Sequence, residues 1–360
     1  MQQSKQQHNK NRATPIPTRW VGPIKVSGSE FNLLKEIPLA TFEKPLWSSV
    51  SRGARLTRIC AGLSATLVKE CMARSILVEA DSAVQLMAVV RDLELPACRA
   101  ALIQVTKATS VFLELQEWQT HIVGNLLYVR FSFSVGDASG HNMATKAADA
   151  LLDWLLARYQ FLRYVSVSGN FCVDKKVSAV NSVLGRGKYV VAEMLVPRAV
   201  CSRVLRALPE EIVGLHIKKN LLGSIVAGSI CSANAHFANM LLAFYLATGQ
   251  DAANIVEGSQ GIVHAELRGE DLYFSVTLPN LIVGAVGSGK NLVFAQENLA
   301  ALDCLVVKNS GVAQIGVGVA ARKLAVLAAA GVWCGEISLL AAQCNRGELV
   351  RSHMEIERNL

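Results

Sequence analysis

The sequence lacks the patterns that mark a disulfide framework or a structural zinc site. Its nine cysteines are scattered between Cys60 and Cys344, and they form neither a CxxC pair nor a Cys/His ligand pattern. Disulfide-rich and zinc-binding domains place these residues at short, recurring spacings. We therefore predict no metal site and reduced thiols, as in a cytoplasmic protein.

Clustered positive charge is also missing. The net charge is +8, from 36 Lys and Arg against 28 Asp and Glu, but the excess forms no basic tail or arginine-rich block. Proteins that bind nucleic acid usually gather such charges in one place. We predict no nucleic-acid partner, and a small phosphate-bearing ligand would use the same positive balance.

A hydrophobic leader is absent as well: residues 1–14 are polar and predict a disordered lead-in. The uncharged run from Leu221 to Thr248 is long enough to cross a bilayer. Its Ser, Asn and His side chains would be costly in lipid. We interpret the run as a long buried central helix that stops at Gly249, and predict no membrane contact.

What the chain does have is a large apolar content and alternating element patterns. Of its 360 residues, 51% are hydrophobic and 18% are charged, which favours two packed units. Helical patterns at 82–93, 97–115 and 142–158 enclose a strand pattern at 125–135. This order predicts an α+β fold in which a small ferredoxin-like α+β domain, residues 76–166, is inserted into a large helix-rich domain, residues 15–75 and 167–360. Further along, the large domain shows strand patterns at 189–196, 262–267 and 271–278, a short helix at 198–207, and mostly helix from 291 to 349.

One short loop gathers unusual charge. Residues 166–176, Ser-Val-Ser-Gly-Asn-Phe-Cys-Val-Asp-Lys-Lys, place Asp174 beside Lys175 and Lys176 between apolar runs. Adjacent charges of this kind are normally solvated, and Asp174 could simply pair with Lys175. In a loop they can instead clamp an anion, and the residues alone leave both readings open.

Three further motifs accompany this loop: Gly-Gln-Asp ending at Asp251, Ala-Thr-Phe-Glu ending at Glu43, and Ser-His-Met around His353. Taken singly each has an ordinary explanation, because Asp251 suits a helix N-cap and a histidine in a tail is usually solvated. Together, in this order and spacing, they resemble the catalytic domain of the 3-hydroxy-3-methylglutaryl-coenzyme A (HMG-CoA) reductase family, more closely its eukaryotic and archaeal branch.

The resemblance implies an oxidoreductase of the mevalonate pathway to isoprenoids. Such an enzyme reduces HMG-CoA to mevalonate and free coenzyme A (CoA) with two NAD(P)H, and NADPH is favoured over NADH. It also implies a homodimer, or a dimer-based tetramer, with the active site at the subunit interface.

The resemblance further assigns roles. Lys175 stabilises negative charge on the carbonyl oxygen, Glu43 donates a proton, Asp251 tunes both in one hydrogen-bonded cluster, and His353 protonates the departing CoA thiolate. The remaining residues fall into three groups: Arg74, Ser168, Lys176, Lys219, His236 and Asn239 for the substrate, Arg52, Arg55 and Ser338 for CoA, and Asp137, Ala138, Ser139, Gly140, His141, Asn142, Gly284, Val286, Gly287, Ser288 and Gly289 for the nicotinamide cofactor.

The chain departs from the family pattern at Phe42, Lys44, Ser139, His141, Ser288 and Lys290. Gly284, Gly289 and Lys290 imitate the spacing of a nucleotide P-loop, but Asn291 replaces the hydroxyl residue that would hold magnesium. Two alternatives remain open: the same site running oxidatively with NAD in mevalonate breakdown, and a degenerate homologue that binds CoA ligands without catalysis.

Overall fold

The computed structural model describes residues 14–28, 30–306, 317–351 and 354. The predicted lead-in at residues 1–14 therefore lies outside the described residues, except for the exposed Thr14, and so does His353. The fold is α+β, as the sequence predicts.

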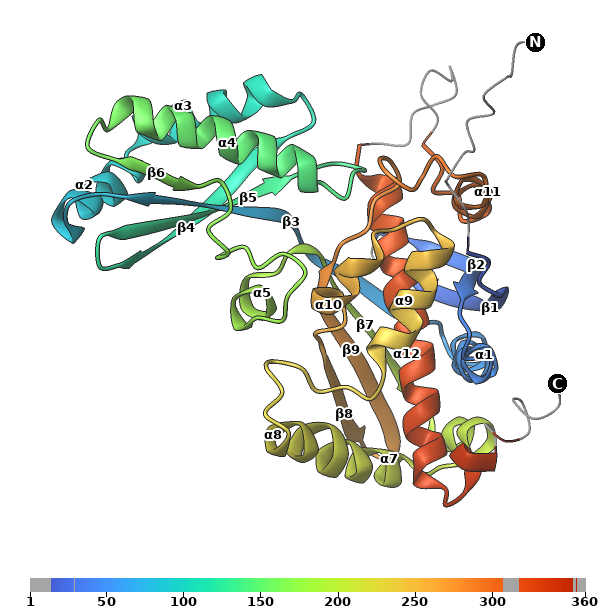
Figure 1. Cartoon of the computed structure of the whole chain (residues 1–360). Helices are drawn as coiled ribbons and strands as arrows, with labels where there is room; N and C mark the ends of the chain where they lie inside the picture. The colour runs from blue at the N-terminus through green and yellow to red at the C-terminus, as the bar shows by residue number, and fades with distance from the viewer. Residues whose placement is uncertain (1–13, 29, 307–316, 352–353, 355–360) are drawn as a thin grey trace, which may run out of the picture.

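An antiparallel sheet of seven strands runs through the molecule (Figure 1), in the order β4-β5-β3-β7-β9-β8, with β6 paired to the end of β3. Strand β3 has 16 residues; its first half pairs with β7 and its second half with β5. A separate hairpin is formed by β1 and β2. The strands are β1 Thr18–Ser27, β2 Asn32–Ala40, β3 Ser64–Glu79, β4 Glu114–Val123, β5 Leu126–Ser134, β6 Arg163–Ser166, β7 Gly187–Val196, β8 Ile262–Arg268 and β9 Asp271–Leu281.

Helices cover the sheet, and local signals start several of them. Pro45 and Pro96 stand at the first positions of α1 and α3, and the Ser82 side chain caps α2 by accepting a hydrogen bond from the amide of Gln85. The helices are α1 Pro45–Ile59, α2 Ala83–Leu93, α3 Pro96–Thr109, α4 His141–Arg158, α5 Ala179–Leu184, α6 Arg198–Val200, α7 Pro209–Leu215, α8 Ser224–Val226, α9 Phe237–Ala247, α10 Ile255–Gly258, α11 Val293–Ala301 and α12 Val319–Cys344, with π-helical turns at Cys201–Leu205 and His216–Gly223 and a 3-10 turn at Ala252–Asn254.

Helix α12 is the centre of the larger unit. Among the described residues it is the one helix long and apolar enough to span a membrane, yet 94% of its most apolar window is buried inside the protein. The Trp333 indole donates to the carbonyl oxygen of Phe274 on β9 at 2.9 Å. A Cβ at Gly53 would collide with the backbone of Cys334, so the close crossing of α1 over α12 requires glycine.

The long buried helix predicted for 221–248 is wrong. Helix α8 ends at Val226, an irregular loop follows, and α9 begins only at Phe237. Gly228 interrupts the helix with a φ of 71°, and Ile225 and Val226 are 74% and 89% exposed. The absence of charged residues from 221 to 248 gave no sign of this break. The long buried central helix of the molecule is α12 instead. The predicted stop at Gly249, with a φ of 65°, is confirmed.

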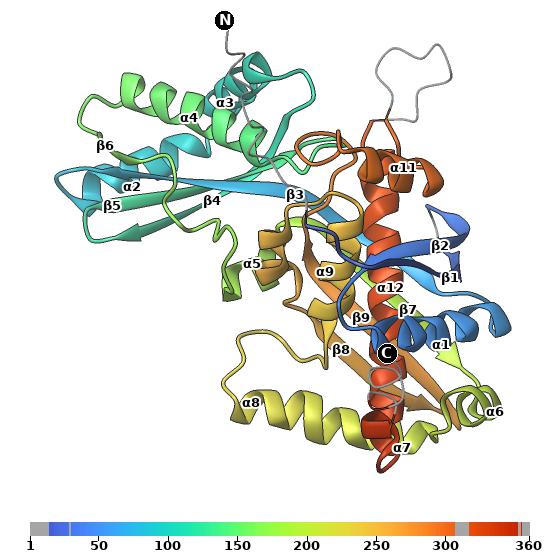
Figure 2. The same cartoon turned by 45° about the vertical axis from the view of Figure 1, so that its right-hand side comes forward.

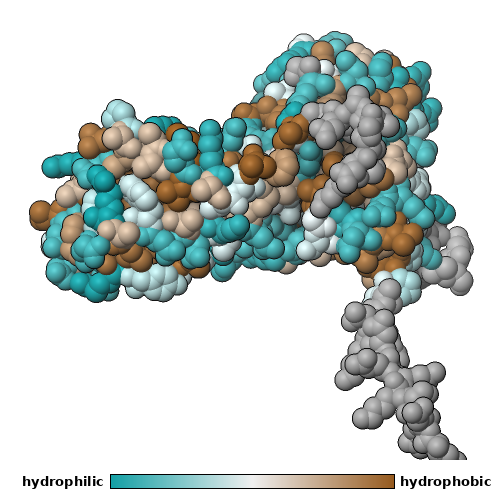
Figure 3. All heavy atoms as spheres, turned by 90° about the horizontal axis from the view of Figure 1, so that it is seen from above, coloured by the Kyte–Doolittle hydropathy of each residue, from teal (hydrophilic) through white to brown (hydrophobic). Residues whose placement is uncertain are grey.

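Two clusters of buried apolar residues lie along the sheet. The smaller one combines the end of β3, strand β5 and helices α2, α3 and α4, while the larger one surrounds α12. Around the smaller cluster the chain runs β-α-α-β-β-α-β with strand order β4-β5-β3-β6, which is the predicted ferredoxin-like arrangement with one additional helix. Figures 2 and 3 show the two units as two lobes, and apolar side chains are scattered among polar ones over both.

Most of the predicted elements are confirmed. Helices α2 and α4 and strands β5, β7, β8 and β9 lie where the patterns indicate them, and α11 and α12 supply the helix predicted from 291 to 349. The helix predicted for 97–115 ends at Thr109, because the chain turns through Ser110 and enters β4 at Glu114.

Candidate active site

The loop that carries Lys175 has an unusual backbone. Asn170, Val173 and Lys175 have φ values of 63°, 43° and 55°, in the left-handed region that residues other than glycine rarely adopt. Such a conformation persists only where the surroundings hold it in place.

Buried side chains hold this loop. The Asn181 amide donates to the carbonyl oxygens of Cys172 and Val173 at 3.2 and 2.9 Å, and the backbone N–H of Lys175 donates to Glu257 Oε1 at 3.1 Å. Asn181 and Glu257 are fully buried. The position of Lys175 is thus set by residues of α5 and α10, which lie outside the loop and could not be recognised from the loop's own sequence.

Lys175 forms an ion pair with Asp251. Its Nζ donates to Asp251 Oδ2 at 2.7 Å, and the two side chains are 39% and 47% exposed. The hydrogen bond to Asp251 raises the pKa of Lys175. Burial acts to raise the pKa of Asp251, but the hydrogen bonds from Lys175 and the Ala253 amide outweigh it and the pKa is lowered. The N-cap predicted for Asp251 is also confirmed, because its Oδ1 accepts from the Ala253 amide at 3.1 Å.

Asp174 does not pair with the Lys175 amine. Its carboxylate lies 2.9 Å from Arg186 Nη1, 3.6 Å from His141 Nε2 and 3.9 Å from Arg74 Nη1. Burial acts to raise the pKa of Asp174, but His141 and Arg186 outweigh it and hold that pKa far below its usual value. Asp174 therefore ties the loop to β3, to α4 and to the residue before β7.

The other substrate residues predicted for this loop lie nearby. Ser168 and Lys176 are exposed, and Lys176 Nζ donates to the Asp174 carbonyl oxygen at 3.1 Å. The amide of Gly169 donates to the carbonyl oxygen of Ser75 at 2.8 Å, which places Ser168 beside the strand of Arg74. We call the set Arg74, Ser168, Lys175, Lys176 and Asp251 the lysine half-site.

A second polar cluster lies at the start of α9. Asn239 Nδ2 donates to Glu43 Oε2 at 2.8 Å and lies 3.5 Å from His236 Nδ1. His236 Nε2 is 3.0 Å from the carbonyl oxygen of Gly335. Since a carbonyl oxygen only accepts, Nε2 carries the proton and Nδ1 is the acceptor. We call Glu43, Lys219, His236 and Asn239 the glutamate half-site.

Glu336 of α12 lies beneath this cluster and is fully buried. Its carboxylate accepts hydrogen bonds from the backbone amides of Ala235 and His236. Burial raises the pKa of Glu336 to about 7 and lowers the pKa of His236 to about 4. Burial also lowers the pKa of Lys219, against the attraction of Glu336. His236 is therefore neutral at physiological pH.

Helix α9 separates the two half-sites. Asn239 lies in its first turn, and Asp251 follows its last. At a rise of 1.5 Å per residue, the helix from Asn239 to Ala247 is about 12 Å long. The single cluster expected of Lys175, Glu43 and Asp251 is therefore not formed within one chain.

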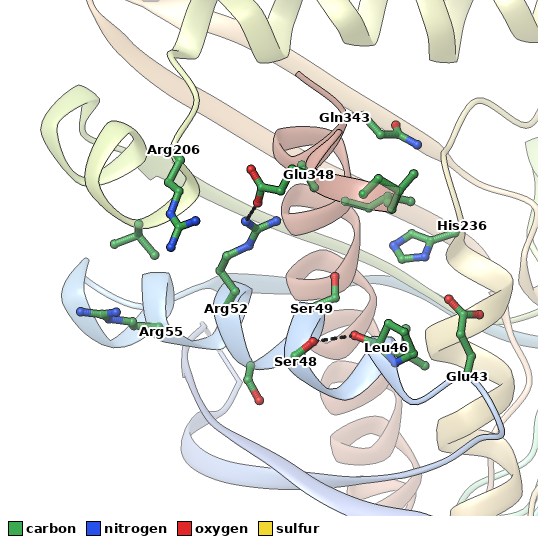
Figure 4. A pocket seen from close by; sticks show the side chains of 16 residues that line it. Glu43, Leu46, Ser48, Ser49, Arg52, Arg55, Arg206, His236, Gln343 and Glu348 are labelled. Atoms are coloured by element: carbon green, nitrogen blue, oxygen red, sulfur yellow. Dashed lines mark hydrogen bonds and ion pairs between the residues drawn. The ribbon is translucent and has the colours of Figure 1, made fainter. Parts of the chain in front are cut away.

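A cavity of about 630 Å³ opens next to the glutamate half-site (Figure 4), between α1 and the end of α12. Arg52 and Arg55, both predicted to bind CoA, line it. Ser338, predicted with them, is fully buried. Its hydroxyl accepts hydrogen bonds from Arg52 Nε and Ser49 Oγ, each at 3.0 Å. Ser338 therefore supports Arg52 and does not face the cavity.

Arg206 also lines the cavity, although it is not among the residues predicted to bind CoA. It follows the π-helical turn Cys201–Leu205 and has a φ of 58°. Pro209, three residues later, indicates that a helix must stop near this point. That signal predicts a turn, but only the tertiary structure brings this turn to the cavity.

The two loops predicted to bind the nicotinamide cofactor lie side by side. The amides of Ala285 and Val286 donate to the carbonyl oxygen of Asp137 at 2.7 and 3.2 Å, and Ala138 forms a parallel bridge with Val286. A Cβ at Gly284 would collide with the backbone of the first loop, so glycine permits the contact.

Within the first loop, the Asp137 side chain has a structural partner. Its carboxylate accepts from the amides of Gly318 and Ala321 at 2.8 and 3.0 Å, at the start of α12, where negative charge is favourable. Gly140 then has a φ of 91° and leads into α4 with no side-chain cap. The first amides of α4, from His141 and Asn142 onward, thus suit an anion.

The second loop is joined to the turn that carries Asp251. The Gln250 amide donates to the Gly284 carbonyl oxygen at 3.1 Å and accepts from the Gly284 amide at 3.0 Å. A Cβ at Gly249 would lie 2.5 Å from the Gly289 carbonyl oxygen. Lys290 of this loop is buried, which lowers its pKa to about 8. The cofactor loops therefore adjoin the Lys175–Asp251 pair.

Within the described ranges, no group of three or more His, Cys, Asp and Glu side chains is arranged to hold a metal ion. The nine cysteines are all free thiols: six are buried, Cys60 and Cys344 are partly buried, and Cys231 is exposed. The arrangement thus offers cations, carboxylates and a neutral imidazole as its chemical groups.

The chain resembles known proteins over nearly its whole length. Residues 12–358 match the family model described as hydroxymethylglutaryl-coenzyme A reductase. Relatives named 3-hydroxy-3-methylglutaryl-coenzyme A reductase include one from Aeropyrum pernix, 41% identical over 95% of this chain and 79% of the relative, and one from Pyrococcus horikoshii, 40% identical over 95% and 81%.

A relative from another organism group and a solved structure are also similar to this chain. A relative of the same name from Strongylocentrotus purpuratus is 39% identical over 96% of this chain, which spans only 36% of that protein. The class II reductase from Streptococcus pneumoniae, solved bound to NADPH in open conformations, shares the fold with a TM-score of 0.71 at 18% identity, over 94% of this chain and 87% of that one. The predicted resemblance to archaeal and eukaryotic proteins is confirmed.

Proposed function

Because the chain belongs to the hydroxymethylglutaryl-coenzyme A reductase family, we propose that it reduces HMG-CoA to mevalonate and free CoA with two NAD(P)H, in the mevalonate pathway. NADPH is favoured over NADH, since the Streptococcus pneumoniae reductase of the same fold was solved with NADPH. The observation that carries the proposal is the Lys175–Asp251 pair at 2.7 Å, held on a backbone that buried side chains keep in a rare conformation.

Lys175 acts on the reacting carbonyl. Reduction of a thioester, and then of an aldehyde, places negative charge on an oxygen atom, and a fixed ammonium stabilises this charge as it develops. Asp251 keeps Lys175 protonated, because their hydrogen bond raises the lysine pKa. Arg74, Ser168 and Lys176 bind the carboxylate and hydroxyl groups of the substrate.

The glutamate half-site supplies protons and further substrate contacts. Glu43 donates a proton, while Lys219, His236 and Asn239 bind the substrate. His236, neutral and with Nδ1 as an acceptor, suits a hydrogen bond to a hydroxyl group better than a charge interaction. His353, which lies outside the described residues, protonates the departing thiolate of CoA.

CoA binds in the cavity beside α1. The guanidinium groups of Arg52, Arg55 and Arg206 bind its phosphates, for which their planar, permanently charged form is well suited. Ser338 orients Arg52 through its hydroxyl and carbonyl oxygens, at 3.0 and 2.5 Å.

The residues of the two glycine-containing loops fit a nicotinamide cofactor. The uncapped amides at the start of α4 suit its diphosphate, and the loops adjoin Asp251. When bound, the cofactor supplies hydride. The residues that hold it are Ala138, Ser139, Gly140, His141, Asn142, Gly284, Val286, Gly287, Ser288 and Gly289. The small domain, 76–166, accordingly binds the cofactor, and the large domain, 15–75 and 167–360, binds the substrate and CoA.

A second copy of the chain completes the active site, in a homodimer or a dimer-based tetramer. Two observations support this: the half-sites lie at opposite ends of α9, and the segment before α9 exposes the apolar side chains of Ile225, Val226 and Ile230, which are 74%, 89% and 51% exposed. The protein is cytoplasmic, which is consistent with the burial of its most apolar long helix, α12, in the core.

Nicotinamide absorbance during turnover tests the activity. With HMG-CoA, NADPH should be consumed faster than NADH. Faster reduction of NAD by mevalonate and CoA would favour the oxidative direction of the same site. Calorimetric binding of CoA without any turnover or nicotinamide binding would instead favour the degenerate ligand-binding homologue.

Mixing inactive variants tests the shared site. Lys175→Met and Glu43→Gln should each be inactive alone. If the half-sites of one active site come from different subunits, random reassociation of equal amounts restores about a quarter of the sites. No recovery after confirmed subunit exchange would show that each chain carries its own complete site.

A further inference from the structure

Arg52, in the cavity proposed for CoA, has a protein acceptor on each of its three nitrogens. Nε donates to Ser338 Oγ at 3.0 Å, Nη2 to the Ser338 carbonyl oxygen at 2.5 Å, and Nη1 to Glu348 Oε1 at 2.7 Å. The two contacts to Ser338 orient the guanidinium. The contact to Glu348 is different in kind, because it places an anion on the cation that should bind phosphate.

Glu348 comes from the turn that follows α12. This turn is held over the cavity by Asn345, whose amide donates to the carbonyl oxygen of Arg206 at 2.8 Å. The side chains of Arg52 and Glu348 are only 23% and 20% exposed. Figure 4 shows Arg52, Arg206 and Glu348 at the same end of the cavity.

Nη1 of Arg52 already donates to the Glu348 carboxylate at 2.7 Å, so a phosphate that binds the same N–H group must replace this carboxylate. Each is an anion that seeks the same donors, and two anions at this distance in a partly buried site repel each other. The rigid contacts with Ser338 also prevent Arg52 from turning freely to offer another donor pair.

We propose that Glu348 is an internal stand-in for a phosphate group of the ligand, so that a CoA phosphate binds Arg52 only by displacing the Glu348 carboxylate. This inference rests on the proposed function, which assigns CoA to the cavity. Glu348 then determines specificity: it weakens the binding of ligands that carry a phosphate at this point, and it does not change the affinity for ligands without phosphates.

Displacement has a structural consequence. The Arg52–Glu348 pair joins α1 to the segment after α12, and that segment continues towards His353 through Arg351. Binding of the phosphate releases one of the contacts that hold this segment, while the contact of Asn345 with Arg206 remains.

Calorimetric titration with CoA and with pantetheine, which lacks the phosphates, tests the proposal. Glu348→Gln should raise the affinity for CoA roughly 3- to 10-fold, the range expected when a competing partly buried ion pair is removed. The affinity for pantetheine should stay unchanged. The matched control is Glu266→Gln, which removes an equal charge from an ion pair with Arg268 at 2.8 Å on β8, away from the cavity. It should change neither affinity.

The pair itself is isolated by a double-mutant cycle. In the Arg52→Gln background, which should bind CoA more weakly, Glu348→Gln should give no gain. Thermal unfolding of every variant verifies that it folds, and Glu348→Asp, which keeps the charge on a shorter side chain, should bind CoA with an affinity between those of the wild type and Glu348→Gln.

The outcomes separate this inference from the proposed function. Arg52→Gln could bind CoA more weakly than the wild type while Glu348→Gln binds it no more tightly than the wild type. This result overturns the inference alone, and shows that the ion pair only stabilises the turn. Absence of CoA binding to the wild type overturns the proposed function and this inference together.

Discussion

The lysine half-site and the glutamate half-site lie at opposite ends of α9, and they differ in whether hydrogen bonding or burial dominates the pKa values of their side chains. Lys175 and Asp251 are 39% and 47% exposed, and their mutual hydrogen bond keeps both charged. Around the glutamate half-site, burial raises the pKa of Glu336 to about 7 and lowers that of His236 to about 4, so that both groups shift towards their neutral forms.

The difference teaches what each end can contribute. A charged, partly exposed ammonium is ready to stabilise an oxyanion. A desolvated, neutral imidazole on a fixed backbone offers direction for hydrogen bonds but little charge. The two ends are thus complementary, which fits their proposed meeting across a subunit interface.

The largest expected effect comes from removing the ammonium. Lys175→Met should lower kcat by about 10²- to 10³-fold, the usual cost of losing a group that stabilises transition-state charge, with little change in stability. Steady-state kinetics and thermal unfolding measure both. Lys69→Met is the control, because Lys69 has a similar ion pair with Glu117 at 2.6 Å, is 33% exposed and belongs to neither half-site. Near-normal turnover by Lys175→Met would contradict the mechanism.

The turn that carries Asp251 is expected to be sterically intolerant. A Cβ at Gly249 would meet the Gly289 carbonyl oxygen at 2.5 Å and Ala295 Cβ at 2.9 Å. Gly249→Ala should lower the free energy of unfolding by about 1–3 kcal/mol more than the same substitution at a glycine that has an equal φ but open space around it. Gly269→Ala is that control, since both glycines have a φ of 65° but nothing lies within 4 Å at Gly269. Equal losses in urea denaturation would show that backbone strain alone matters.

The buried glutamate should affect how stability depends on pH. The folded protein keeps a proton on Glu336 up to about pH 7, while an unfolded glutamate releases it near 4.5. The folded state thus binds more protons, and this contribution to stability falls as pH rises. His236, shifted from 6.5 to about 4, binds fewer protons when folded, and its contribution rises with pH between these values.

In the wild type these two slopes oppose each other between about pH 4.5 and 6.5. Glu336→Gln removes the first, so the free energy of unfolding of the variant should rise more steeply with pH, by up to about 1.4 kcal/mol per pH unit. Denaturant titrations between these pH values measure the slope, with Glu297→Gln, on an exposed position of α11, as the control. Parallel slopes for all three proteins would refute the assignment.

The smallest effect is expected at the rim of the cavity. Arg206→Ala should raise the KM for HMG-CoA about 10-fold, the loss of one charge-assisted contact to phosphate, and leave kcat nearly unchanged. Arg203→Ala, on the preceding exposed position of the same turn, is the matched control. If the two variants behave alike, Arg206 does not bind the ligand.

Local pattern predicted much of the fold. Helices α2 and α4 and strand β5 follow from the periodicity of their apolar residues, and strands β7, β8 and β9 from short apolar runs. The segment at 221–248 shows where this fails: composition alone cannot tell an exposed helix, a loop and a short buried helix from one long buried helix. Arg206 was missed for a related reason, since its approach to the cavity depends on a turn meeting a distant helix.

By itself the sequence determined the family, the α+β class and the residue types of the site, because order and spacing of motifs are properties of the chain alone. Only the tertiary structure decided which of these residues meet. Contacts between distant segments depend on the packing of α9, α12 and the sheet, so the pairing of Lys175 with Asp251, the separation of Glu43 from both, and the Glu348 carboxylate on Arg52 appear only in the folded molecule.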